Sequence, residues 1–214
     1  MTEILEIIGS LGVVPVVKIE DAGQALDLAD ALTDGGLPVA EITFRTTAAE
    51  AAITSIVDAR PDMLVGAGTV LTTEQAGQAI GAGARFIVAP GFNPTVVAYC
   101  QKHDTPVFPG VCTPTDIEAA LGFGLTALKF FPAEAFGGLK TLKALGGPYG
   151  NVKFIPTGGI STNNLADYLA SPKVLACGGS WMVAADMISG GEFEKISDLT
   201  REAVAIAKDA RSGS

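Results

Sequence analysis

Apolar runs alternate with helix-like segments from one end of the chain to the other. Eight short apolar runs have the length and composition of buried strands. They cover residues 13–19, 39–44, 63–70, 86–91, 106–111, 127–132, 153–159 and 174–180. Between them, segments such as 21–36 and 46–61 carry apolar residues at helical spacing and close with Gly or Pro. The pattern therefore predicts repeated strand–helix units joined by short loops.

Eight strands, each followed by a helix, favour an α/β fold of the (β/α)8 TIM-barrel type over an open doubly wound sheet. No G-x-G-x-x-G follows the first strand, which disfavours a dinucleotide-binding fold. The chain has 214 residues and no Pro-, Ser- or charge-rich linker, so we expect one domain over 1–214. We expect a short N-terminal helix over 3–9 to cap the barrel, and a disordered tail over 210–214.

The charge balance narrows the class of partner. Lys and Arg number 14 against 23 Asp and Glu, giving a net charge of −9. This argues against nucleic acid and anionic membranes, because both bind cationic surfaces. It does not argue against a small anionic substrate, which needs only local donors. The N-terminus lacks a basic region and a cleavage site, and no apolar run is long enough to span a bilayer, so we expect a cytoplasmic protein.

Histidine and cysteine usage excludes several kinds of catalytic site. His103 is the single histidine, so a zinc site built on several imidazoles is impossible. The three cysteines form no C-x-x-C pair, which indicates neither a cysteine-only zinc site nor a disulfide framework. We therefore expect no zinc site built on histidines or cysteines. We expect His103, before the strand at 106–111, to lie on the rim opposite the active site.

The second strand carries three polar residues of the same parity. Glu41, Thr43 and Arg45 alternate with Ala40, Ile42 and Phe44. The apolar set should face the helices, which places a carboxylate, a hydroxyl and a guanidinium inside the barrel. An internal Glu–Arg ion pair is the structural alternative, but buried pairs add little net stability. In this fold the carboxyl ends of the strands carry the chemistry, which favours a functional role.

The sixth strand contains a lysine among apolar residues. In A-L-K-F-F-P, parity places Leu128 and Phe130 toward the helices and Lys129 inward with Phe131. Burial disfavours the charged ammonium and favours the nucleophilic amine that attacks a carbonyl to form a Schiff base. The alternative is a structural lysine paired with Glu41.

Strands seven and eight end in glycine pairs. The runs P-T-G-G-I-S-T-N-N and C-G-G-S-W place Gly158, Gly159, Gly179 and Ser180 where barrels often bind phosphate. Ser161 or Thr162 as a helix cap is the alternative for the first run. Thr69 and Pro90 follow strands three and four. A β-branched core residue and a carboxylate-binding residue are equally good interpretations of Thr69.

Seven motifs, in order along nearly the whole chain, resemble one family. They are V-V-P-V-V, E-I-T-F-R-T, V-G-A-G-T-V, A-P-G-F, L-K-F-F-P-A-E, P-T-G-G-I and G-G-S-W. The set is similar to that of the 2-keto-3-deoxy-6-phosphogluconate (KDPG) aldolase and 4-hydroxy-2-oxoglutarate (KHG) aldolase family. The phenylalanine before Arg45 departs from the aliphatic residue expected there, but parity turns it toward the helices.

The resemblance implies a class I aldolase barrel, usually a homotrimer, without a metal or another cofactor. By matching motif, Lys129 would be the Schiff-base lysine and Glu41 the general acid and base. The remaining motif positions would bind substrate: Arg45 and Thr69 the carboxylate, Gly158, Gly159, Gly179 and Ser180 the phosphate, and Pro90 and Phe131 the pocket wall.

The implied reaction is cleavage of KDPG to pyruvate and D-glyceraldehyde 3-phosphate, as in the Entner–Doudoroff pathway. The alternatives are an aldolase for 2-keto-3-deoxy-6-phosphogalactonate or 4-hydroxy-2-oxoglutarate and, more remotely, a non-catalytic phosphosugar-binding barrel. Ser180 favours a phosphorylated 2-keto acid, because a hydroxyl and backbone amides suit phosphate. An isomerase or epimerase would not need the lysine in the sixth strand.

Overall fold

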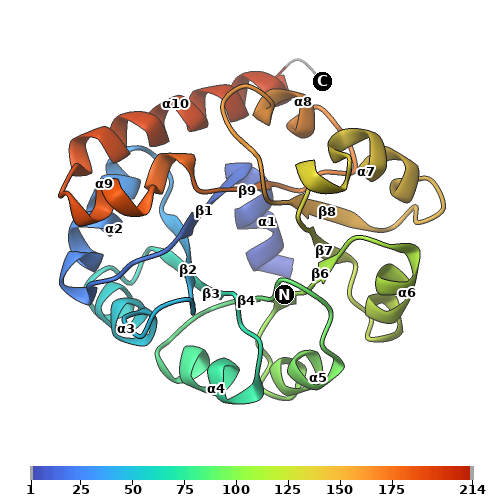
Figure 1. Ribbon diagram of the computed structural model, residues 1–214, viewed down its shortest axis with the longest axis horizontal. Coiled ribbons are helices and arrows are strands. Elements are labelled where there is room, and N and C mark those ends of the chain that lie inside the picture. The colour runs from blue at the N-terminus through green and yellow to red at the C-terminus, as the bar shows by residue number, and fades with distance from the viewer. Residues whose placement is uncertain (1, 213–214) are drawn as a thin grey trace.

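The computed structural model describes residues 2–212, in which helices surround a curled parallel sheet (Figure 1). The strands are β1 (Val13–Val17), β2 (Val39–Thr43), β3 (Leu64–Gly68), β4 (Ile87–Val88), β5 (Val107–Phe108), β6 (Gly110–Val111), β7 (Ala127–Phe130), β8 (Lys153–Pro156) and β9 (Cys177–Gly179). The α-helices are α1 (Thr2–Leu11), α2 (Ala25–Asp34), α3 (Ala49–Ala59), α4 (Thr73–Gly81), α5 (Pro94–Lys102), α6 (Pro114–Gly122), α7 (Gly138–Gly146), α8 (Leu165–Leu169), α9 (Ala185–Ser189) and α10 (Phe193–Ser212). Short 3-10 helices are η1 (Ala22–Gln24), η2 (Glu134–Phe136) and η3 (Trp181–Val183).

The strands form two parallel sheets. One has the order β5-β4-β3-β2-β1-β9 and the other β6-β7-β8. Every strand pairing is parallel, and an isolated bridge between Thr157 and Gly178 links the end of β8 to β9. All strands therefore end on the same rim. This arrangement confirms the predicted alternation of parallel strands and outer helices as an α/β, barrel-like fold.

The predicted strand over 106–111 is divided in two. Pro109 separates β5 from β6, because proline has no N–H to donate to a neighbouring strand. Its carbonyl still accepts a hydrogen bond from Lys129 N, at 3.0 Å. The other predicted strands are present but shorter. The run at 86–91, for example, pairs only over Ile87–Val88.

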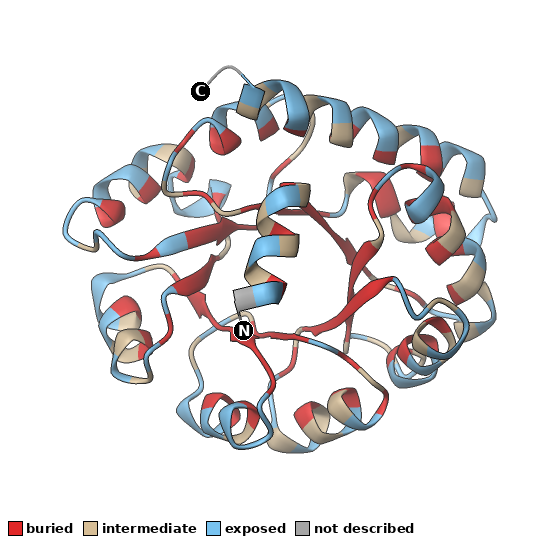
Figure 2. Ribbon diagram, turned by 180° about the vertical axis from the view of Figure 1, so that it is seen from behind, coloured by how far each residue is buried: buried red, intermediate tan, exposed pale blue. Residues whose placement is uncertain are grey.

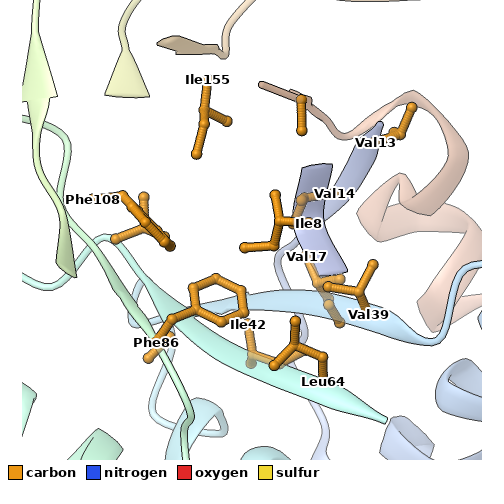
Figure 3. Packing of buried hydrophobic residues seen from close by; sticks show 14 of the residues in the cluster. Ile8, Val13, Val14, Val17, Val39, Ile42, Leu64, Phe86, Phe108 and Ile155 are labelled. Carbon is orange, nitrogen blue, oxygen red and sulfur yellow. The ribbon is translucent and has the colours of Figure 1, made fainter. Parts of the chain in front are cut away.

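Helix α1 closes the end of the sheet opposite that rim. It leads directly into β1 through Gly12, and it lies across the middle of the strands (Figure 2). Ile4 and Ile8 are buried, and Ile8 points among side chains that include Val14 and Phe108 (Figure 3). This position agrees with the predicted cap. No helix within residues 2–212 is both long and apolar enough to cross a membrane.

The expectation of a disordered tail was wrong for residues 210–212. Helix α10 continues to Ser212, and the Arg211 guanidinium donates hydrogen bonds to the carbonyls of Gly9 and Leu175. These contacts satisfy carbonyl groups at the end of α1 and before β9, which fixes the last turn of α10. Residues 213–214 lie outside the described part of the chain.

The interior pairs large side chains with glycines on neighbouring strands. A Cβ on Gly66 of β3 would lie 2.3 Å from the ring of Phe86, which is buried. By contrast, a Cβ on Gly81, at the end of α4, would meet no atom within 4 Å. The glycine in the strand is therefore required by packing, whereas the one in the helix is not.

We predict opposite effects for alanine at these two positions. Gly66→Ala overpacks the interior and should lower the free energy of unfolding by about 1–3 kcal/mol. Gly81→Ala should raise it by about 0.5–1 kcal/mol, because alanine loses less conformational freedom in a helix. Urea unfolding monitored by circular dichroism measures both. Equal stability of Gly66→Ala and the parent protein would contradict the packing described here.

Candidate active site

The sequence-predicted site residues lie at, or just after, the carboxyl ends of parallel strands. Arg45 follows β2, Thr69 follows β3 and Pro90 follows β4. Phe131 follows β7, and Gly158 and Gly159 follow β8. Gly179 ends β9, and Ser180 comes directly after it. Glu41 and Lys129 lie within β2 and β7. Because the strands are parallel, these positions share one rim of the fold.

Lys129 and Glu41 form a buried ion pair. The Nζ atom of Lys129 donates to Oε1 of Glu41 at 3.3 Å, and the two side chains are only 6% and 5% exposed. Their strands belong to different sheets, so the pair spans the interior. The predicted parity is confirmed on β7, where Phe130 instead packs against Phe154 with ring centroids 6.4 Å apart.

Small residues make room for this pair. A Cβ on Gly68 would lie 2.1 Å from Oε1 of Glu41, so only glycine fits beside the carboxylate. A cavity of about 10 Å³ adjoins the pair and is lined by Thr157 and Gly178 among apolar side chains. The apolar walls keep water away from the two charges, which strengthens their interaction.

The ring of Phe131 lies over the lysine. Its centroid is 5.3 Å from Nζ of Lys129, within the range of a cation–π contact. The half-buried ring therefore forms a wall beside the amine at the rim. This agrees with the predicted inward direction of both side chains.

Arg45 does not pair with Glu41, so the structural alternative considered for β2 is wrong. Its Nε atom donates to the hydroxyl of Thr43 at 3.1 Å, and that hydroxyl donates to the carbonyl of Val17 at 2.6 Å. Arg45 is exposed, and within residues 2–212 its guanidinium forms no ion pair with a carboxylate. It leaves a cation at the rim that can bind an external anion.

The glycine pair after β8 has a backbone that other residues rarely adopt. Gly158 and Gly159 have φ of 100° and 81°. Asn164 donates to the carbonyl of Gly159 at 3.0 Å and accepts from the amide of Ser161 at 2.9 Å. Asn164 directly precedes α8, but its side chain makes no capping hydrogen bond there. The Ser161 hydroxyl accepts from the amide of Asn163 at 3.4 Å, and its carbonyl accepts from the amide of Leu165 at 3.0 Å, so Ser161 caps the turn that leads into α8.

Comparison with known proteins decides the family. The family model "KDPG and KHG aldolase" matches residues 4–199. The chain is 51% identical to 2-dehydro-3-deoxy-phosphogluconate aldolase of Treponema pallidum (strain Nichols), over 96% of this chain and 98% of that protein. The chain belongs to the KDPG and KHG aldolase family.

Two solved structures of similar proteins contain small-molecule ligands. KDPG aldolase from Legionella pneumophila, with pyruvate captured at low pH as a covalent carbinolamine intermediate, has a TM-score of 0.90 and 39% identity, covering 93% of this chain and 97% of that one. The enzyme of Zymomonas mobilis ZM4 with 3-phosphoglycerate has a TM-score of 0.89 and 39% identity, covering 96% and 97%. The family resemblance found in the motifs is therefore confirmed over nearly the whole chain.

Two features of this family member were missed in the sequence. Thr157, just after β8, faces the cavity beside Lys129. Its inward direction could have been predicted from the sequence, because it lies two residues after the inward Ile155 and directly before the glycine pair. Tyr168 on α8 donates to the carboxylate of Glu134, the last residue of the lysine motif. Burial, then this hydrogen bond, raise the pKa of Tyr168 above its usual range. No sequence pattern pointed to the Tyr168–Glu134 contact.

The remaining predicted residues lie at the same strand ends and form no hydrogen bond to the ion pair. Thr69 has a φ of 56°, and the backbone of Gly179 lies against the ring of Trp181. Pro90 and Ser180 are on the same rim, and none of these four residues forms a side-chain hydrogen bond with Lys129 or Glu41. Exposed His103 caps the end of α5, and residues 2–212 contain no cluster of three or more His, Cys, Asp or Glu side chains suited to a metal.

We predict that Lys129 and Glu41 do not contribute independently to the free energy of unfolding. Lys129→Met should lower the free energy of unfolding by about 3–5 kcal/mol, because Glu41 loses its counter-charge inside the protein. The double variant Lys129→Met/Glu41→Leu should recover most of this loss, since no charge stays buried. Guanidinium chloride unfolding of the single and double variants measures the coupling.

Lys140, an exposed lysine on α7, is the matched control. Lys140→Met should change the free energy of unfolding by less than about 0.5 kcal/mol. If the double variant loses as much free energy of unfolding as the Lys129→Met and Glu41→Leu variants lose together, the two charges do not interact.

Proposed function

We propose that this protein is a class I aldolase that cleaves KDPG to pyruvate and D-glyceraldehyde 3-phosphate through a Schiff base on Lys129. The observation that carries the proposal is the buried Lys129–Glu41 pair, at 3.3 Å, where β7 and β2 approach the rim. The pyruvate carbinolamine of the Legionella relative supports the same chemistry. Lysine attack on a ketone needs neither a metal nor another cofactor.

The proposed reaction begins with proton transfer inside the pair. Glu41 takes a proton from the Lys129 ammonium, and the free amine attacks the C2 ketone to give a carbinolamine. Glu41 returns its proton to the carbinolamine hydroxyl, which leaves as water and gives an iminium. Electrons flow into this iminium when the C3–C4 bond breaks. Glu41 accepts the C4 hydroxyl proton, directly or through water, as glyceraldehyde 3-phosphate leaves. Glu41 then gives this proton to C3 of the remaining enamine, and hydrolysis of the resulting iminium frees pyruvate and Lys129.

The rim residues supply binding at the two charged ends of the substrate. Arg45 and Thr69 bind the carboxylate beside C2. The amides of Gly158, Gly159 and Gly179 and the hydroxyl of Ser180 bind the phosphate, and Pro90 and Phe131 line the space between the two ends. The bound 3-phosphoglycerate of the Zymomonas relative supports a ligand that carries both a carboxylate and a phosphate.

We also propose how the two sheets are arranged. The two sheets form one closed (β/α)8 barrel, a single domain over 1–214, with β5 and β6 as parts of one strand position. The bridge between Thr157 and Gly178 supports closure on one side, and the short separation of β5 from β6 supports it on the other. We further propose a cytoplasmic homotrimer that acts on small molecules, with neither nucleic acid nor membrane as a partner.

The second candidate function lies within the family. The matched family model covers both KDPG and KHG aldolases, so cleavage of 4-hydroxy-2-oxoglutarate is the alternative. A preference for the phosphogalactonate epimer is a further alternative, since both sugars present the same charged ends. Rates of cleavage of the three substrates under one condition rank these possibilities, and the phosphorylated gluconate should be the fastest.

We predict that borohydride traps pyruvate on one lysine. Reduction with pyruvate should inactivate the enzyme, and peptide mass analysis should find the adduct on Lys129. Lys129→Ala should give no adduct and no cleavage, whereas Lys140→Ala should be trapped like the parent enzyme. An adduct at another lysine would refute the proposed nucleophile.

We also predict that Glu41→Gln separates the chemical steps. Removal of a positioned acid–base group should slow cleavage by about 10²–10⁴-fold. Lys129 should still be trapped with pyruvate, though slowly, because the nucleophile is retained. Steady-state cleavage rates and the time course of trapping measure the two effects. Unchanged turnover would exclude Glu41 as the proton carrier.

A further inference from the structure

Thr43 connects the end of β1 to the guanidinium of Arg45. The hydroxyl of Thr43 donates to the carbonyl of Val17 at 2.6 Å and accepts from Nε of Arg45 at 3.1 Å. Thr43 is the last residue of β2, and it is only 1% exposed. Its side chain is therefore fixed by the sheet, while Arg45 two residues later is exposed at the rim.

The chemistry of the hydroxyl sets the direction of both hydrogen bonds. A threonine hydroxyl has one proton and two lone pairs. The proton is committed to Val17, because a carbonyl oxygen can only accept. A lone pair is then left for the N–H of Arg45, so the bond to β1 orients the acceptor that holds the guanidinium.

This contact matters because Arg45 is otherwise weakly held. An arginine side chain has several rotatable bonds, and ordering it costs conformational entropy at the moment of binding. Anchoring Nε restricts the orientation of the guanidinium and leaves its two Nη groups for another acceptor. Those groups form the edge that binds a carboxylate through two parallel hydrogen bonds.

We propose that Thr43 is a positioning residue that holds Arg45 ready for the substrate carboxylate. The inference rests on the proposed function, in which Arg45 binds the carboxylate beside the C2 ketone. Thr43 touches no reacting atom and acts only through Arg45. Its effect belongs to binding of the 2-keto acid end and not to the proton transfers of Lys129 and Glu41.

The experiment uses pyruvate alone, which has the carboxylate and ketone but no phosphate. The pyruvate concentration that gives half-maximal borohydride inactivation is measured for the parent enzyme and for Thr43→Val, Thr43→Ser, Arg45→Ala and Thr43→Val/Arg45→Ala. KM and kcat for KDPG cleavage are measured on the same variants. Thermal unfolding of each variant reports its stability.

Thr46, in the loop that follows β2, offers a matched control. Its hydroxyl donates to the carbonyl of Ile19 at 2.6 Å, as that of Thr43 does to Val17, but it holds no guanidinium. Thr46→Val therefore removes a similar contact between this loop and the segment after β1 without touching Arg45. It should leave the half-saturating pyruvate concentration within about twofold of the parent value.

The expected result is a loss of binding that depends on Arg45. Thr43→Val should raise the half-saturating pyruvate concentration by about tenfold, the effect of one hydrogen bond to a charged group. It should raise KM for KDPG and change kcat by less than about threefold, and Thr43→Ser should restore binding. In the Arg45→Ala background, Thr43→Val should add no further loss.

Other results would overturn the inference in distinguishable ways. An undiminished effect of Thr43→Val in the Arg45→Ala background would show that Thr43 acts by another route, while the proposed function stands. An unchanged half-saturating concentration in Arg45→Ala would remove the carboxylate role of Arg45, and the inference with it. Absence of any pyruvate adduct in the parent enzyme would refute the proposed function itself.

A second variant keeps the test decisive if Thr43→Val fails to fold. Thr43→Cys has nearly the size of threonine but a weaker donor and acceptor. Binding should then fall in the order Thr, Ser, Cys, and the differences should vanish without Arg45. Equal binding by the threonine, serine and cysteine forms would overturn the inference.

Discussion

The structure depends on keeping two opposite charges inside an apolar interior. Lys129 and Glu41 come from different sheets and meet at 3.3 Å with almost no exposure. Removing two ions from water is costly, and their attraction offsets this cost only at close range. The two strands must therefore bring these atoms together accurately, and the helices around them must keep the sheet curled enough to do so.

That accuracy is achieved with very small residues beside large ones. Gly68 leaves space for the Glu41 carboxylate, Gly66 for the ring of Phe86, and Gly178 for the side chain of Thr157. In each case a Cβ would lie closer than any normal contact, so the glycine on one strand is matched to the side chain on the next. Alternation of small and large residues fills a narrow curled sheet, and here it also sets where the charged atoms lie.

The inward direction of the two charged residues and the rim they share could be predicted from the sequence, because side chains alternate along a strand and parallel strands end on one side of a sheet. Period-two alternation placed Glu41 and Lys129 inward, and eight apolar runs placed their strand ends on one rim. The contacts that depend on three-dimensional neighbours could not be predicted. Local patterning left both Arg45 and Lys129 open as the partner of Glu41, and only the structure selects Lys129. It also did not indicate that Tyr168 reaches Glu134 across 34 positions. The order of residues 210–212 likewise depends on carbonyls at Gly9 and Leu175, which are distant in sequence.

Side chains of the site are exposed at the rim and buried below it, and this difference suits the proposed substrate. Arg45, Gly159 and Ser180 are exposed at the rim, whereas Lys129 and Glu41 are buried below it. A carboxylate and a phosphate are expensive to remove from water, while a ketone is neutral and can be buried at much lower cost. An exposed rim lets both charged ends keep part of their hydration as the neutral carbonyl moves toward the amine. The net charge of −9 therefore says little about binding of the proposed substrate, because the two cations proposed to meet it, Arg45 and Lys129, are local and lie at two depths.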